Sequence, residues 1–202
     1  MTAQDVTAGL VKQLRDLTGA GMMDCKRALV EAGGDLDKAQ EILRLKGLAG
    51  AKRREGRVAS EGVVQAYIHG EGALGVLVEV NSETDFVART DEFRTLAKEL
   101  AMQIAATNPR WITREEVPDD ILESERKIYA EKARSEGKPD NVIDRIVAGQ
   151  VNSFYKDNVL LEQDYIREPK RTVSDLVSEV AAKVGENVVV RRFARFKVGE
   201  EL

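Results

Sequence analysis

The sequence predicts an α+β fold, with a small helical domain followed by a core of strands and helices. Three observations support this prediction. Short helical patterns fill the first 47 residues, a two-residue period begins at Val58, and long helical patterns follow without regular alternation with strands. The chain of 202 residues, 43% hydrophobic and 33% charged, is long enough for one sizeable core and a satellite domain. This composition is typical of a folded, helix-rich protein.

The N-terminal segment contains three helical patterns, each closed by glycine, which tolerates the left-handed conformation that follows a helix end. Apolar residues recur at helical spacing from Val6 to Leu17 in the first pattern, and Asp35 can cap the third. The closing glycines are Gly19, Gly33 with Gly34, and Gly47. We predict a three-helix domain over residues 1–48, followed by a basic linker over residues 49–57 that has no apolar periodicity.

The predicted core covers residues 58–202 and opens with an antiparallel hairpin. Its first strand places three apolar residues on one side, namely Val64, Ala66 and Ile68. A turn at Gly70–Gly72 leads into a more apolar strand over Gly75–Val80. A final alternating strand, Val188–Phe196, is expected to rejoin this hairpin.

Four helices are predicted between these strands. The first is capped by Thr90, and the last is capped by Thr172 and ends at Gly185. The first buries an apolar face, and its members are Phe93, Leu96, Ala97, Leu100, Ala101 and Ile104. The charged segments 119–136 and 140–157 predict an antiparallel helical hairpin with solvated faces.

Enzyme chemistry leaves no recognisable trace in the residues. His69 is the sole histidine, and its position beside a turn favours an ordinary surface residue over an acid–base group. Paired acids such as Asp119 and Asp120 lie in charged segments, which favours solvated surface over catalytic carboxylates. No glycine-rich phosphate loop is present. We therefore expect no catalytic residue and no bound cofactor, and a small carboxylate hydrolase is disfavoured.

Charge and cysteine content limit the other classes of function. The sole cysteine, Cys25, excludes an internal disulfide and a cysteine-rich metal site, so no metal is expected. The net charge of −4 argues against nucleic acid as the primary partner. No apolar run is long enough to span a membrane, and the N-terminal residues lack the pattern of a signal peptide. These features predict a cytoplasmic protein.

Two methionines, Met22 and Met23, lie between a glycine-rich turn and the start of a helix. Methionine is flexible and polarizable, so it suits adaptable interfaces as well as irregular cores. Taken alone, the chemistry slightly favours core packing over a partner surface.

The segment Asn81–Arg89 connects the apolar strand to a helix and carries an aromatic residue. Thr84 can cap a short turn, with Asp85 near its start, Phe86 projecting beside it and Val87 supporting it. Two interpretations are equally compatible with the pattern: Phe86 acts as a rigid wedge for a partner, or it covers the edge of the sheet.

Several of these motifs together resemble the elongation factor Ts family. They are Leu10–Arg15, Thr18–Lys26, Thr84–Val87, Gly137–Pro139 and Gly185–Phe193, and the similarity runs from Val6 to Gly199. The resemblance implies an N-terminal ubiquitin-associated-like three-helix domain joined to an α+β dimerisation core. It also implies a guanine-nucleotide exchange factor that acts on elongation factor Tu carrying GDP during protein synthesis.

The resemblance also assigns roles to individual residues. The segment matching Asp85 and Phe86 inserts between helices of the GTPase near the magnesium of its nucleotide, with Thr84 and Val87 beside it. Residues matching Lys12, Arg15, Met22 and Met23 contact the same GTPase domain. These implied contacts favour a partner surface over core packing for the two methionines. They also favour the interpretation of Phe86 as a wedge over the one in which it covers the edge of the sheet. The alternative is an adaptor that binds through its three-helix domain without promoting exchange.

The chain departs from longer family members, which carry two related core halves. Because it has room for one core half, its resemblance to shorter members implies a homodimer. Some short members have a cysteine in the final strand that links two subunits, but here the matching residue is Ala194. Asp164 and Tyr165 also replace an expected Pro-Phe pair, which makes the local geometry of that loop an open question.

Overall fold

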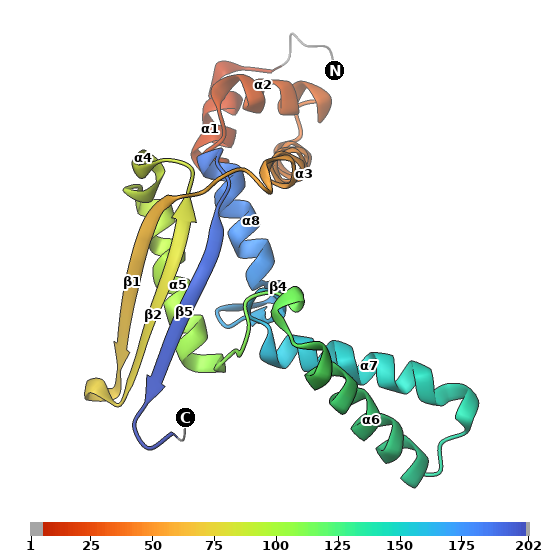
Figure 1. Cartoon of the computed structure of the whole chain (residues 1–202). Coiled ribbons are helices and arrows are strands. Elements are labelled where there is room, and N and C mark those ends of the chain that lie inside the picture. The colour runs from red at the N-terminus through yellow and green to blue at the C-terminus, as the bar shows by residue number, and fades with distance from the viewer. Residues whose placement is uncertain (1–5, 201–202) are drawn as a thin grey trace. The chain divides into compact units, whose positions relative to one another are not determined.

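The computed structural model describes residues 6–200, so the outermost ends of the two predicted domains lie outside the described residues. The chain divides into two compact units. One holds the chain up to Gly62 together with Ser82–Phe93 and Val177–Val189, and the other holds the remaining segments. The fold is mixed helix and sheet, as predicted (Figure 1). The domain boundaries at residues 48 and 58 stay a prediction.

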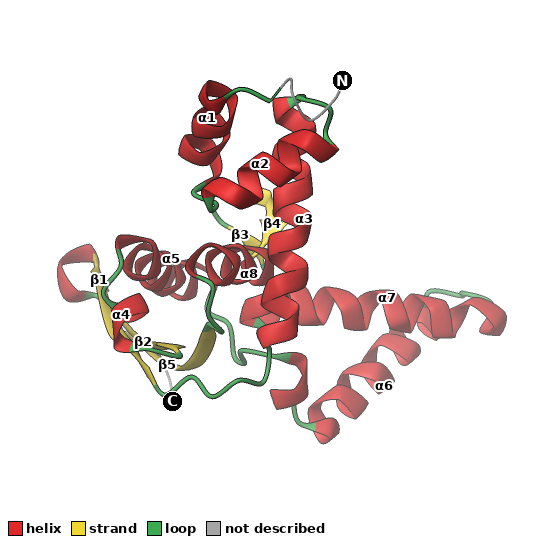
Figure 2. Cartoon of the chain, turned by 90° about the horizontal axis from the view of Figure 1, so that it is seen from above, coloured by secondary structure: helices red, strands yellow, loops and turns green. Residues whose placement is uncertain are grey.

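The N-terminal helices α1 (Ala8–Thr18), α2 (Met22–Glu31) and α3 (Leu36–Arg54) form a small bundle (Figure 2). Its buried centre consists of Val11, Leu14, Cys25, Ala28, Leu29 and Ala39. Two predicted helix boundaries are confirmed. Gly19 follows α1 with φ of 68°, a conformation that L-residues with a side chain rarely adopt, and the Asp35 carboxylate accepts a hydrogen bond from the Lys38 backbone N–H.

Helix α3 is longer than the sequence predicted. It was expected to end before Gly47, but it continues through Gly47 and Gly50 to Arg54, so the first part of the predicted linker is helical. The physical reason lies in packing at Gly47, where an added Cβ would lie 3.1 Å from the Cβ of Ala182. Gly47 therefore permits a close approach to another helix and does not end its own.

The sheet consists of β1 (Glu61–His69), β2 (Leu74–Ser82) and β5 (Val189–Lys197), in the order β1-β2-β5. The predicted return of the last strand to the hairpin is therefore confirmed. The 3-10 turn η1 (Gly70–Gly72) joins β1 to β2. Helix α5 (Asp91–Thr107) covers one face of the sheet, as Figures 1 and 2 show. That side of the core contains Val76, Val78, Val80, Phe93, Leu96, Leu100 and Ile104.

The opposite face of the sheet carries exposed apolar residues. Val64 and Ile68 in β1 share one side of the strand, as predicted, but this is the exposed side. The half-buried residues of β1 are instead Val63, Gln65 and Tyr67. Strand periodicity identifies residues that share a face, but it cannot tell which face a helix covers when both are apolar.

A helical hairpin, α6 (Asp119–Ser135) and α7 (Asp140–Asn158), follows α5 as predicted (Figure 2). The 3-10 turn η2 (Arg114–Glu116) precedes α6, and at the base of the hairpin Val117, Phe154 and Val159 are buried together. The chain continues through η3 (Leu160–Glu162), β3 (Asp164–Tyr165), β4 (Glu168–Thr172) and α8 (Val173–Val184). The antiparallel pair β3 and β4 was not predicted, and it includes the Asp164–Tyr165 segment whose geometry had been left open.

A buried polar network centred on Gln103 joins α5 to the segment after the hairpin. The Gln103 side-chain amide donates to Gln163 Oε1 at 3.2 Å and to the Asp164 carbonyl at 3.1 Å. Its Oε1 accepts from the Ile166 backbone N–H at 2.9 Å. Gln103 is 1% exposed, so removing its amide would break three hydrogen bonds in the interior, although Gln163 Oε1 would still accept from the Thr107 hydroxyl at 2.7 Å.

We expect Gln103→Leu to lower the free energy of unfolding by about 2 to 4 kcal/mol, because it removes three hydrogen bonds made by a buried side chain. Urea unfolding followed by circular dichroism measures the change. Gln150→Leu is the matched control, since Gln150 is exposed on α7. Equal stability of the Gln103 variant and wild type would contradict a structural role for the network.

Candidate functional site

The short helix α4 (Asp85–Ala88) follows β2 directly and carries the predicted wedge. Thr84 caps it, as predicted, because its Oγ1 accepts a hydrogen bond from the Val87 backbone N–H at 3.4 Å. The Ser82 hydroxyl donates to the Thr84 carbonyl at 2.9 Å, which fixes the bend between β2 and the helix. Ala88 is buried and Val87 half-buried, so the back of α4 is anchored in the protein.

Phe86 projects from α4 into solvent with 78% of its surface exposed. This exposure contradicts the interpretation in which Phe86 covers the edge of the sheet. The neighbouring Asp85 carboxylate accepts a hydrogen bond from Arg89 Nη2 at 2.7 Å. An exposed aromatic residue held on a capped turn is a preformed apolar contact for another molecule.

A second loop, which follows α8, holds the start of α4. Glu186 accepts two hydrogen bonds from Thr84: the backbone N–H donates to Oε2 at 3.0 Å and the hydroxyl donates to Oε1 at 2.7 Å. In return, Glu83 Oε1 accepts from the Asn187 backbone N–H at 2.7 Å. Glu186 was not among the predicted site residues, although it lies within one of the motifs that carry the family resemblance.

The four predicted N-terminal contact residues are all exposed. Lys12 and Arg15 lie on α1, and Met22 and Met23 begin α2 with 55% and 65% of their surfaces exposed. The preference for buried methionines that chemistry alone gave is therefore wrong. Leu17, expected within the apolar stripe of the first helix, is also exposed, at 61%. Leu17 and the methionines flank the Gly19–Gly21 turn, so apolar side chains gather at this end of the bundle.

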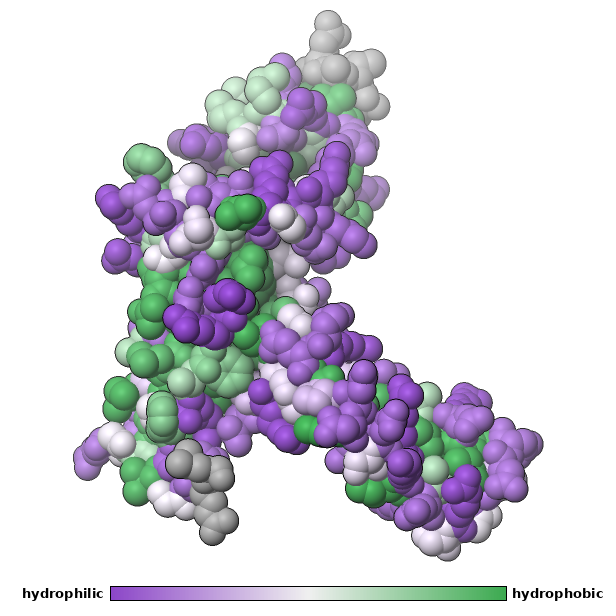
Figure 3. Space-filling model, in the orientation of Figure 1, coloured by the Kyte–Doolittle hydropathy of each residue, from purple (hydrophilic) through white to green (hydrophobic). Residues whose placement is uncertain are grey.

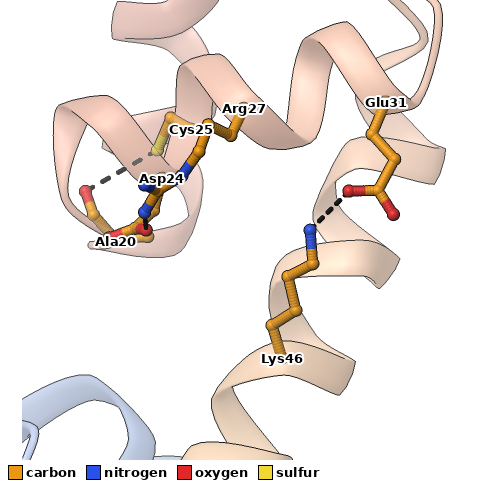
Figure 4. A network of polar contacts seen from close by, with 6 residues as sticks. All are labelled: Ala20, Asp24, Cys25, Arg27, Glu31 and Lys46. Atoms are coloured by element: carbon orange, nitrogen blue, oxygen red, sulfur yellow. Dashed lines mark hydrogen bonds and ion pairs between the residues drawn. The ribbon is translucent and has the colours of Figure 1, made fainter.

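A cavity of about 770 Å³ lies beside the same turn. Its lining includes Leu17, the Gly19–Gly21 turn, Arg27 and Lys46. Ion pairs join Arg27 to Asp24 and Lys46 to Glu31, and the Cys25 thiol donates to the Ala20 carbonyl at 3.6 Å (Figure 4). The cavity is thus bordered by paired charges, and the exposed Leu17 is part of its lining.

The candidate site therefore has two parts, and the structure does not bring all predicted residues into one cluster. Thr84, Asp85, Phe86 and Val87 belong to one capped turn. Within residues 6–200, no hydrogen bond or ion pair joins this turn to the N-terminal residues Lys12, Arg15, Met22 and Met23.

Metal-binding clusters and membrane-spanning helices are both absent from the described residues. Across 6–200, no group of three or more histidine, cysteine and acidic side chains is arranged to hold a metal ion. In the same range, none of the helices is both long enough and apolar enough to cross a bilayer.

Comparison with known proteins identifies the family. The family model described as Elongation factor TS matches residues 50–200, which is most of the chain. The chain belongs to the elongation factor Ts family. It is 62% identical to the elongation factor Ts of Caldanaerobacter subterraneus subsp. tengcongensis over 96% of this chain and 98% of that protein. It is 56% identical to that of Coprothermobacter proteolyticus, over 97% of this chain and 100% of the relative. Each of these two relatives therefore aligns with this chain over nearly its whole length.

Proposed function

We propose that this member of the elongation factor Ts family is a guanine-nucleotide exchange factor for elongation factor Tu. The observation that carries the proposal is Phe86, a highly exposed aromatic residue on a short helix whose start is capped and held by a second loop. The family resemblance gives the corresponding segment the role of a wedge in the GTPase. Membership in a translation factor family agrees with that role, and with action in the cytoplasm.

The proposed mechanism is linkage between two binding events. Bound GDP is held largely by magnesium and by backbone amides around its phosphates, so a wedge that disturbs these groups weakens the hold on GDP. Phe86 acts by steric and apolar contact, and Asp85 supplies an acceptor that competes for local donors. By reciprocity, if this protein lowers the affinity for GDP by some factor, GDP lowers the affinity for this protein by the same factor. Exchange then passes through a transient ternary complex.

The N-terminal bundle provides the docking surface in this proposal. Lys12, Arg15, Met22 and Met23 are all exposed, and the methionines can adapt to a partner surface. Leu17 extends the same apolar end of the bundle. Docking there and insertion of Phe86 are separate contacts, so their contributions to binding and to exchange can be measured separately.

We also propose a homodimer in which the uncovered face of the sheet pairs with the same face of a second copy. Exposed apolar residues occur on all three strands, among them Val64, Ile68, Leu77 and Phe196. Apolar residues gather over this face in Figure 3. A contiguous exposed apolar surface favours association, and a C2 dimer pairs one such face with itself.

Release of a fluorescent GDP analogue from elongation factor Tu tests the exchange function. Stopped-flow traces with excess unlabelled GDP should show release accelerated by at least tenfold in the presence of this protein, with a rate that saturates as its concentration rises. The adaptor alternative predicts binding to elongation factor Tu with an unchanged release rate. That result, with binding verified by calorimetry, would overturn the exchange function.

A further inference from the structure

The loop that follows α8 contacts α4 although the two lie far apart in the sequence. Thr84 and Glu186 are 102 positions apart, yet they share two hydrogen bonds. We propose that Glu186 is a positioning residue that fixes the start of α4, and with it the direction in which Phe86 projects. This inference rests on the exchange function proposed above, because it assigns a task to Glu186 within the same site.

The Glu186 carboxylate acts on the cap of α4 through the threonine hydroxyl. That hydroxyl donates its hydrogen to Glu186 Oε1 at 2.7 Å, so its lone pairs are free to accept from the Val87 backbone N–H. The other carboxylate oxygen accepts from the Thr84 backbone N–H at 3.0 Å. One side chain therefore fixes both the backbone and the capping group at the first turn.

A second set of contacts makes the attachment reciprocal. Glu83 Oε1 accepts from the Asn187 backbone N–H at 2.7 Å, and Glu83 Oε2 lies 3.5 Å from Arg57 Nη1. The Asn187 side-chain amide donates to the Arg57 carbonyl at 2.8 Å, and Asn187 is 8% exposed. Each loop thus gives a glutamate to a backbone N–H of the other. Attachment at two neighbouring points prevents the rotation that a single hydrogen bond would allow.

Helix α4 needs such support at its first turn, because the burial of Ala88 anchors only its back. A helix of four residues is far too short to be stable by itself. Phe86, its largest side chain, is mostly exposed and adds little packing within the chain. A wedge that is already ordered loses less conformational entropy on insertion. A larger fraction of the molecules then holds Phe86 in the orientation needed for insertion. The contacts of Glu186 therefore act on exchange more than on global stability.

Kinetics of the Glu186→Ala variant test this role. We expect the maximal rate of accelerated GDP release to fall roughly tenfold to a hundredfold. The concentration giving half-maximal release should stay within about twofold of wild type, because the N-terminal docking surface is untouched. The maximal rate with Glu186→Gln should fall between those of wild type and Glu186→Ala, since the glutamine amide retains one acceptor oxygen. Glu123→Ala, at an exposed position on α6, is the matched control and should behave as wild type.

A double-mutant cycle separates positioning from a general structural role. In the Phe86→Ala background, adding Glu186→Ala should cause no further loss, because no wedge remains to be positioned. A further tenfold loss in that background, or a wild-type rate for Glu186→Ala alone, would overturn the proposal.

Amide hydrogen exchange tests the same contact without the GTPase. In Glu186→Ala, exchange in the segment 82–89 should accelerate while α1 to α3 and α5 keep wild-type protection. Unchanged protection of 82–89 would overturn the proposal. If wild type does not accelerate GDP release but this local loss of protection appears, the exchange function fails while the positioning of α4 by Glu186 stands.

Discussion

Replacing Phe86 by alanine should lower the maximal rate of accelerated GDP release by roughly 30-fold to 1000-fold. Truncating a central aromatic contact costs about 2 to 4 kcal/mol at many interfaces, and each ~1.4 kcal/mol corresponds to a tenfold change. The loss should be large because Phe86 is the apolar group that α4 projects, and Asp85 beside it is engaged with Arg89. Stopped-flow release from elongation factor Tu measures it directly.

Stability should be unaffected by this substitution. Phe86 is 78% exposed, and exposed positions of this kind change the free energy of unfolding by about 0.5 kcal/mol or less. Ile128→Ala is the matched control, because Ile128 is a large exposed apolar residue on the helical hairpin. Release as fast with Phe86→Ala as with wild type would rule out the wedge mechanism, whatever the control shows.

Leu77→Lys should convert the proposed homodimer into a monomer. Leu77 lies in the central strand of the sheet and is 49% exposed on the uncovered face. In a symmetric dimer the substitution brings two ammonium groups into one apolar interface, where unpaired charges are costly. Analytical ultracentrifugation should give twice the chain mass of 22.3 kDa for wild type and the single mass for the variant.

Two further variants sharpen this test. Ile128→Lys adds the same charge on α6 and should leave the mass at that of the dimer. Ala194→Cys, in the final strand, should form a covalent dimer under mild oxidation, because the family resemblance implies that a cysteine at this position can link two subunits. The native Cys25 is buried and should not compete. A wild-type mass equal to one chain at micromolar concentration would refute the dimer.

Much of the fold was predictable because helix ends in this chain carry strong local signals. The backbone turns after α1 at Gly19, and Asp35 and Thr84 cap the helices that they precede. Such caps act over three or four residues, so they can be read from the sequence alone. The six apolar residues predicted for the buried face of α5, from Phe93 to Ile104, are all buried, although the buried Gln103 on the same helix was not predicted.

Features that depend on tertiary packing were not predictable from local pattern. Gly47 resembles a helix end, but α3 continues through it because another helix approaches closely at Ala182. Leu17 fits the apolar period of α1, yet it is exposed. Val64 and Ile68 share a face that α5 does not cover. In each case the local pattern carries no information about which part of the chain packs against the residue.

The candidate site was predicted in part for the same reason. Thr84 and its capping role follow from adjacent residues, and the exposure of Phe86 decided between two interpretations that the sequence left equal. The contact of Glu186 with Thr84 joins residues 102 positions apart, so no local pattern could reveal it. Its presence in the Gly185–Phe193 motif was the single available signal.

The uninterrupted course of α3 fixes which of its residues share a helix face as far as Arg54, where a basic linker without periodicity was expected from residue 49. Each residue of an α-helix turns the chain by about 100° and advances it by about 1.5 Å. Adding or deleting one residue between Gly47 and Arg54 would therefore turn the residues of α3 after that point by about 100° relative to those before it. The number of residues in this segment, and not only their chemistry, is under structural constraint.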